Sequence, residues 1–158
     1  MRRFTPVELA VGAALVGSVA AVAVPVFIRD LHASRFAEPT TALARMSQNA
    51  VAYAEASRHF PGSAPLTPAN PPRGAKEADP PGTWEHPAWT TLDFRPVAEG
   101  VPHAFAYAFD SQTSTFVARA HGDLDGDGVL STFELRGVVP PDGPPRVEPG
   151  MYVEAELE

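Results

Sequence analysis

Residues 4–28 read FTPVELAVGAALVGSVAAVAVPVFI, and the last twenty of them, Leu9 to Ile28, carry no charge. As a helix this uncharged run would span about 30 Å, the thickness of the hydrocarbon core of a bilayer. Arginines at residues 2–3 and at residue 29 flank it, and the pair that precedes it favours a cytoplasmic N-terminus. The sequence therefore predicts a hydrophobic helix over residues 4–29 that spans a membrane or lies in a similarly apolar environment.

The rest of the sequence is polar, and its charge is unevenly distributed. The chain has 158 residues, 18 prolines, no cysteine and a formal net charge of −7. Residues 121–158 hold nine acidic and two basic residues, so the first 120 residues are neutral overall. Binding to nucleic acid is not expected, because it needs a basic stripe that this sequence lacks. The absence of cysteine excludes disulfides and cysteine-ligated zinc or iron–sulfur sites.

Two residues of the hydrophobic segment are unusual for a simple anchor. Glu8 directly precedes the uncharged run, and a carboxylate near hydrocarbon is costly unless it has a partner. Pro25 lies near the far end, where it removes one helical hydrogen bond. A cleaved signal peptide would explain the basic start, the apolar middle and the small residues, although the run is long for such a peptide. These features alone leave a signal peptide and a generic membrane anchor open as alternatives.

The same residues resemble the N-terminus of type IV pilins and of the pseudopilins of type II secretion. In that family a prepilin peptidase cuts just before a phenylalanine, which is then methylated. A glutamate lies four residues after that phenylalanine and a proline twenty-one residues after it, the spacings that Phe4, Glu8 and Pro25 have here. The resemblance implies a short leader, residues 1–3, cleaved between Arg3 and Phe4. The family's leaders end in glycine, whereas this one ends in arginine.

The resemblance also implies a function, that of a structural subunit and not of an enzyme. Such a subunit is held in the bacterial inner membrane before assembly. It then polymerises through its N-terminal helix, with copies of itself and other pilin-like subunits, into an extracellular pilus or a periplasmic pseudopilus. In the filament Glu8 would pair with the free amine of Phe4 on a neighbouring subunit. The five histidines are scattered without metal-binding spacing, which agrees with a non-catalytic role.

Residues 30–158 are expected to form a head of the α+β class. Apolar residues recur at three- and four-residue spacing and predict one buried helical face, made of Ala42, Leu43, Met46, Ala50, Tyr53 and Ala54. Pro39 predicts a kink or break of this helix near Glu38. Residues 61–102 contain ten of the 18 prolines and predict a long surface loop.

A short antiparallel sheet is expected over residues 103–158. Alternation of apolar residues predicts strands near 105–109, 115–120 and 152–157, with a hairpin connection at 110–113. Thr91–Val97 would add an edge strand that ends at Pro96, and Trp84 and Trp89 would pin the end of the proline-rich loop to the domain. With the resemblance, the expected fold is pilin-like: a long, kinked N-terminal helix packed on a small antiparallel sheet.

Residues 123–134 match the twelve-residue calcium-loop pattern D-x-D-x-D-G-x5-E. Calcium prefers six to eight hard oxygen ligands, and alternate aspartates on a tight turn supply several. The predicted ligands are Asp123, Asp125, Asp127, the carbonyl of Val129, Ser131 and Glu134. The flanking residues look like strands and not like the helices of an EF-hand, so an acidic β-turn without a cation stays open as an alternative.

A function of a different class also fits, namely a monomeric membrane-anchored or secreted calcium-binding module. The spacing of Phe4, Glu8 and Pro25 favours the filament subunit. Arg3, which stands where the family has glycine, leaves room for the module.

Overall fold

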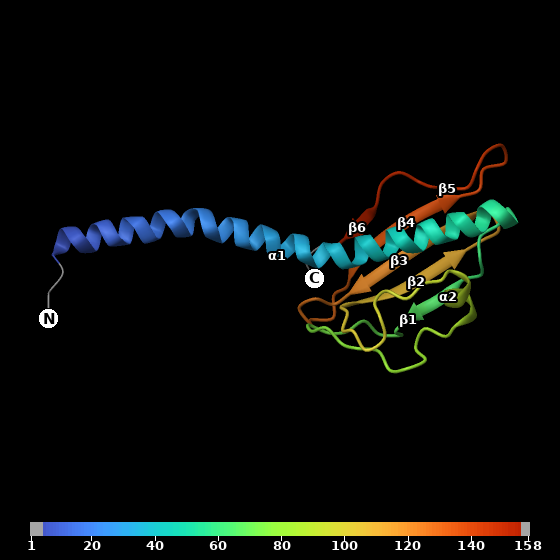
Figure 1. The fold of residues 1–158 in the computed structure, drawn as a ribbon, viewed down its shortest axis with the longest axis horizontal. Coiled ribbons are helices and arrows are strands. Elements are labelled where there is room, and N and C mark those ends of the chain that lie inside the picture. Colours follow the sequence, from blue (N-terminus) through green and yellow to red (C-terminus); the bar gives the residue numbers. More distant parts are fainter. Residues whose placement is uncertain (1–4, 156–158) are drawn as a thin grey trace. The chain divides into compact units, whose positions relative to one another are not determined.

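The computed structural model describes residues 5–155 and, for residues 28–35, the backbone alone (Figure 1). The chain divides into two units, Met1–Phe36 and Ala37–Glu158. Helix α1 (Pro6–Ser57) contributes to both units, and the second unit contains an antiparallel sheet. The predicted α+β class is confirmed.

Residues 6–27 of α1, in the first unit, form an exposed apolar helix. Pro6–Phe27 is long and apolar enough to cross a membrane, and among the described residues it is the one segment with these properties. None of its large side chains is covered by the chain: Val16 is 71% exposed and Phe27 is 64% exposed. A run of this kind needs an apolar environment that the monomer does not provide.

Helix α1 also continues through Pro39, so the break predicted near Glu38 is wrong. Proline costs this turn one backbone hydrogen bond. Contacts with the rest of the second unit offset that loss, because Glu38 accepts hydrogen bonds from the backbone N–H of Ala104 at 2.8 Å and from Lys76 Nζ at 3.1 Å. The kink stays a prediction.

The sheet of the second unit has the order β1-β2-β3-β4-β5, and β6 also pairs with β4, all antiparallel. Its strands are β1 (Ala64–Thr67), β2 (Phe105–Ser111), β3 (Thr115–Gly122), β4 (Ser131–Val138), β5 (Arg146–Val147) and β6 (Tyr152–Glu154). The three predicted strands are confirmed as β2, β3 and a shorter β6. The second half of α1 lies across one face of the sheet (Figure 1).

The core lies between that helix and the sheet. The predicted stripe on α1 is buried except for the half-buried Tyr53, and Leu43, Met46, Ala50 and Ala54 have no exposed surface. Alternate residues of the strands supply the opposite side, with Phe105, Tyr107, Phe109, Phe116 and Phe133 almost completely buried. This alternation follows from the two-residue period of a strand with one covered face.

The proline-rich segment is part of the core and not only a surface loop. It contains β1 and a short helix, α2 (Pro87–Thr91). The edge strand predicted at Thr91–Val97 is wrong, because Thr91 ends α2 and residues 92–97 form turns and bends. Pro87 begins α2 because its fixed φ suits a first helical position. Trp84 and Trp89 are buried as predicted, with ring centroids 5.5 Å apart.

One close approach in the sheet gives a testable prediction. Gly137 on β4 lies opposite Phe116 on β3, and a Cβ atom built on Gly137 would lie 2.1 Å from Cε1 of that ring. Gly137→Ala should therefore lower the free energy of unfolding by about 1–3 kcal/mol through overpacking. Gly62→Ala is the matched control, since nothing lies within 4 Å of its new methyl group. Equal denaturation midpoints for the two variants would contradict this account.

Candidate functional site

Three aspartates converge in the connection between β3 and β4, which we call the acidic loop (residues 123–128). One carboxylate oxygen from each of Asp123, Asp125 and Asp127 lies within 4.8 Å of the other two. The loop begins directly after Gly122, which is the last residue of β3 and pairs with Ser131, the first residue of β4. The hairpin therefore holds three negative charges at the end of a rigid ladder.

Asp123 is the buried member of this group, with 2% of its surface exposed. Its Oδ1 accepts a hydrogen bond from the backbone N–H of Gly126 at 2.8 Å. Its Oδ2 is buried and accepts no hydrogen bond, although Arg73 Nε lies 3.4 Å away as an ion-pair partner. A buried carboxylate oxygen without a hydrogen bond is costly, so this atom is placed to gain from a bound cation.

The other two aspartates are exposed and hold the turn. Asp125 Oδ1 accepts from the N–H of Asp127 at 3.1 Å, and Asp127 Oδ1 accepts from the N–H of Val129 at 2.7 Å. Gly126 and Gly128 have φ angles of 86° and 96°, which side-chain-bearing residues rarely adopt. Among the described residues no hydrogen bond engages the Oδ2 of any of the three aspartates, and the Oδ2 of Asp123 has only the ion pair with Arg73.

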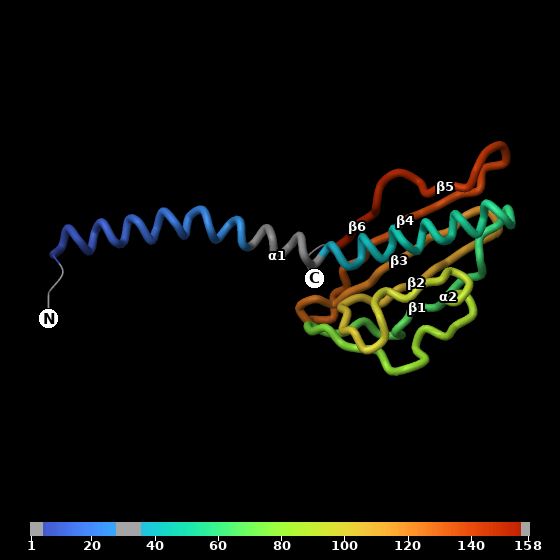
Figure 2. Tube along the Cα trace, viewed as in Figure 1, coloured from blue at the N-terminus to red at the C-terminus, as the bar shows by residue number. Residues whose placement is uncertain are grey.

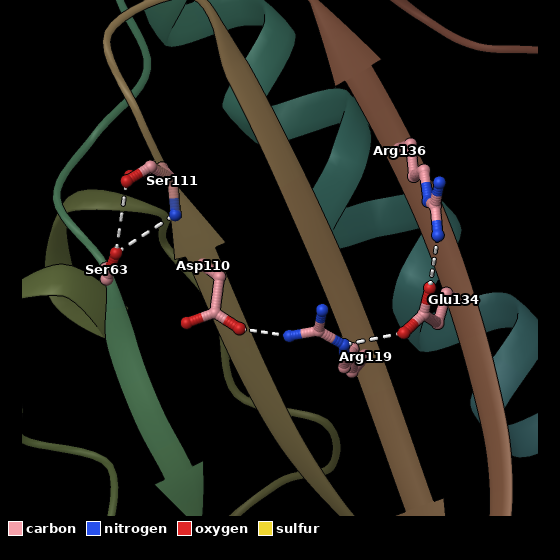
Figure 3. Close-up of polar contacts among 6 residues, drawn as sticks. All are labelled: Ser63, Asp110, Ser111, Arg119, Glu134 and Arg136. Atoms are coloured by element: carbon pink, nitrogen blue, oxygen red, sulfur yellow. Dashed lines mark hydrogen bonds and ion pairs between the residues drawn. The ribbon is translucent and has the colours of Figure 1, made fainter.

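Glu134 does not join the aspartates. It pairs with Arg119 on the neighbouring strand, and three ladder positions, about 10 Å, separate it from Ser131. Figure 3 shows its carboxylate between two arginines, with Arg119 Nε at 2.6 Å and Arg136 Nη2 at 3.1 Å. The calcium-loop pattern is therefore matched only in its first half. Where an EF-hand would begin a helix, this chain continues as a strand, which carries Glu134 away from the loop.

The other two predicted ligands are Ser131 and Val129. The hydroxyl of Ser131 donates a hydrogen bond to the carbonyl of Ala155 at 2.7 Å and is fully buried. Val129 is 49% exposed and follows the acidic loop directly. The structure brings together Asp123, Asp125 and Asp127, whereas the hydroxyl of Ser131 is hydrogen-bonded to the C-terminal segment.

Glu134 gives a prediction for the pH dependence of stability. Burial alone would raise the pKa of Glu134, but hydrogen bonds from Arg119 and Arg136 and their charges outweigh this and hold it below its ordinary value of 4.5. A carboxyl with a lowered folded-state pKa stabilises the fold above its unfolded pKa and loses that effect as the pH falls through the folded value. Glu134→Gln should therefore cost about 1 kcal/mol at neutral pH, a difference that shrinks below about pH 4.5.

Urea denaturation at several pH values measures this difference. Glu55→Gln, an exposed position on α1, is the matched control and should be neutral throughout. A constant difference between Glu134→Gln and the wild type from neutral pH down to about pH 3 would contradict the assignment.

At the start of the hydrophobic helix, Glu8 has a partner within its own chain. The backbone N–H and the hydroxyl of Thr5 donate hydrogen bonds to Glu8 Oε2 at 2.8 and 3.0 Å, and the N–H of Glu8 donates to Thr5 Oγ1 at 3.3 Å. This is a capping box, with Pro6 as the first helical residue. The role of Thr5 was missed in the sequence, although the spacing Thr5-x-x-Glu8 is a recognised signal for such a cap.

Of the other residues predicted for processing and assembly, Pro25 lies inside α1. Arg3 and Phe4 lie outside the described residues. Arg73 was also missed, and no local sequence signal connects it to aspartates fifty residues away.

Comparisons with models of protein families, with curated proteins and with solved structures find no match to this chain.

Proposed function

We propose that the chain is a structural subunit of a type IV pilus or a related pseudopilus. It is held in the bacterial inner membrane by residues 6–27 and polymerises through this part of α1. The observation that carries the proposal is that α1 combines two different segments in one continuous helix. It begins with an exposed apolar segment of membrane length and ends with a face buried in the head. The head's helix packed on a small antiparallel sheet is the arrangement expected of a pilin.

The exposed apolar segment supports both stages of this function. In the membrane, lipid covers side chains such as Leu15, Val16 and Phe27, each more than 60% exposed in the single chain. In a filament, the same side chains of neighbouring subunits would cover one another. Head-to-tail contacts generate a helical filament when their rotation does not close into a ring, and the proposal requires contacts of this open kind.

Glu8 fits this scheme because its carboxylate needs a polar partner both in the single chain and in the filament. In the single chain Thr5 supplies its hydrogen bonds. On assembly the free amine of Phe4 on a neighbouring subunit, after cleavage of residues 1–3 by the prepilin peptidase, would neutralise its charge. Since an unpaired carboxylate in an apolar core costs several kcal/mol, Glu8 favours one docking register over others.

We place a calcium ion in the acidic loop of the head as part of the same proposal. Asp123, Asp125 and Asp127 would hold it, with water and backbone carbonyls completing its coordination. The observation that supports this is the buried Asp123 Oδ2, which accepts no hydrogen bond within the chain. The ion would stabilise the hairpin between β3 and β4 in a protein that has no disulfide.

Asp123→Asn tests the calcium site. Saturating calcium, at about one hundred times its Kd, should stabilise the wild-type head by about 2.7 kcal/mol, and this stabilisation should disappear in the variant. Thermal unfolding of the full chain in detergent, with and without calcium, measures it. Asp142→Asn, an equal charge change at an exposed position, should keep the full calcium effect. A wild type that calcium does not stabilise, or a variant that it still stabilises, would refute the site.

The second candidate function is a monomeric membrane-anchored or secreted calcium-binding module. The acidic loop favours it, because calcium binding by this loop would not require polymerisation. Shearing of cells that produce the chain with its assembly machinery separates the two functions. A filament subunit should pellet with the sheared surface material as a large polymer. A module should stay in the membrane fraction, or in the supernatant as a monomer, and that result would defeat the surface-pilus form of the proposal.

A further inference from the structure

Arg73 and Gly74, in the proline-rich segment, lie directly against the acidic loop. Residues Arg73 and Asp123 form a parallel β-bridge, and the N–H of Gly74 donates a hydrogen bond to the carbonyl of Asp123 at 2.8 Å. In Figure 2 the green trace of this segment and the orange trace of the loop run side by side at one end of the sheet. The acidic loop is therefore held by two parts of the chain that are distant in sequence.

The backbones of the proline-rich segment and of the acidic loop are in close contact here. Gly74 has a φ of 63°, and a Cβ atom on it would lie 3.2 Å from the carbonyl oxygen of Asp125. From the other side, a Cβ atom on Gly126 would lie 3.5 Å from the Gly74 nitrogen. The backbone of the proline-rich segment is thus fitted to the backbone of the loop, and this fit fixes the point from which the Arg73 side chain starts.

The Arg73 side chain lies beside Asp123 and Gly128. Its Nε lies 3.4 Å from Asp123 Oδ2, and its Nη2 lies 3.6 Å from the place where a Cβ on Gly128 would be. At 3.4 Å the pair with Asp123 makes no hydrogen bond, and the Arg73 side chain is 74% exposed. Such an ion pair is weak and is displaced without a large loss.

We infer that Arg73 is the resident counter-charge of the acidic loop and that calcium displaces it from Asp123. This inference rests on the proposed calcium site and adds the residue that sets its affinity. Both cations need the same oxygen, Asp123 Oδ2, so they cannot be bound fully at once. Without calcium the guanidinium partly neutralises the buried carboxylate, and with calcium it must move away from an ion of the same sign.

Calorimetric titration of calcium chloride into the full chain in detergent tests this role. Arg73→Gln should bind calcium roughly three- to tenfold more tightly than the wild type at low ionic strength, and high salt should reduce the gain because it screens the lost repulsion. Arg73→Lys keeps the charge and should stay within about twofold of the wild type. Arg146→Gln is the matched control for net charge, since β5 pairs with β4 at the opposite end from Ser131.

The outcomes separate this inference from the calcium site itself. Tighter binding by Arg73→Gln with unchanged Arg146→Gln, or binding by Arg73→Gln alone, supports displacement. If the wild type binds calcium and Arg73→Gln binds it equally or more weakly, the calcium site stands and the role of Arg73 is wrong. If neither the wild type nor Arg73→Gln binds calcium, both fail. Circular dichroism of each variant verifies that the head is folded.

Discussion

Val16→Arg is expected to reduce partitioning of the chain into the membrane by roughly 100-fold. An arginine at the centre of a membrane helix costs about 2.5–3.5 kcal/mol, and each 1.4 kcal/mol is about a factor of ten. Residues 6–27 are rich in alanine, glycine and valine and contain only two leucines. The wild-type Val16 is 71% exposed in the single chain, so no packing inside the protein is lost.

Extraction of membranes with alkaline carbonate measures this effect. The wild type should stay with the membrane pellet, and Val16→Arg should appear in the soluble fraction or be degraded. Gln112→Arg, which places the same residue in an exposed turn of the head, should behave as the wild type does. Carbonate-resistant Val16→Arg would show that residues 6–27 do not hold the chain in the bilayer.

Glu8→Val is expected to abolish filaments while leaving the chain in the membrane. Valine makes the segment more apolar, so insertion should not suffer. Assembly should suffer because the carboxylate proposed to neutralise a neighbour's amine is gone, and breaking a buried pair costs about 3–5 kcal/mol. Electron microscopy of sheared surface material, together with blotting of the membrane fraction, measures both properties.

Thr5→Val separates assembly from helix capping. This variant loses the hydroxyl of the capping box but keeps the Glu8 carboxylate. Loss of a cap costs about 1 kcal/mol, much less than a broken buried pair, so filaments should persist. Normal filaments from Glu8→Val would refute the assembly role. Equal loss of filaments in both variants would assign the role of Glu8 to capping alone.

The long helix and the main strands were predictable because their signals are local. A run of uncharged residues, a three- and four-residue stripe and strict alternation each follow from the geometry of one element. Pro39 misled for the same reason: it predicts a local break, but the distant contacts of Glu38 with Ala104 and Lys76 hold that turn in place. The helix α2 at Pro87–Thr91 was missed because a short helix buried by tertiary packing has almost no periodic signal.

The sequence predicted the grouping of the three aspartates in the acidic loop but not the position of Glu134. The spacing of Asp123, Asp125 and Asp127 determines a turn that gathers carboxylates, and the structure has it. Whether Glu134 returns to the loop depends on the element that comes after the turn, and here β4 carries it to Arg119, a partner set by strand register. The contribution of Arg73 depends on the path of the whole proline-rich segment, which no spacing in the sequence encodes.

Cysteine crosslinking of the hydrophobic helices tests the central claim most directly. The chain has no cysteine of its own, so a double variant, Leu9→Cys with Val24→Cys, carries thiols only in the segment proposed to form the filament core. A flexible bismaleimide added to cells should link successive subunits and produce a ladder of dimers, trimers and larger species, because each subunit of an open head-to-tail polymer has a neighbour on both sides. Leu9→Cys alone should stop at dimers. Monomers alone from the double variant, in cells that make their full assembly machinery, would contradict the claim that this chain polymerises through its N-terminal helix.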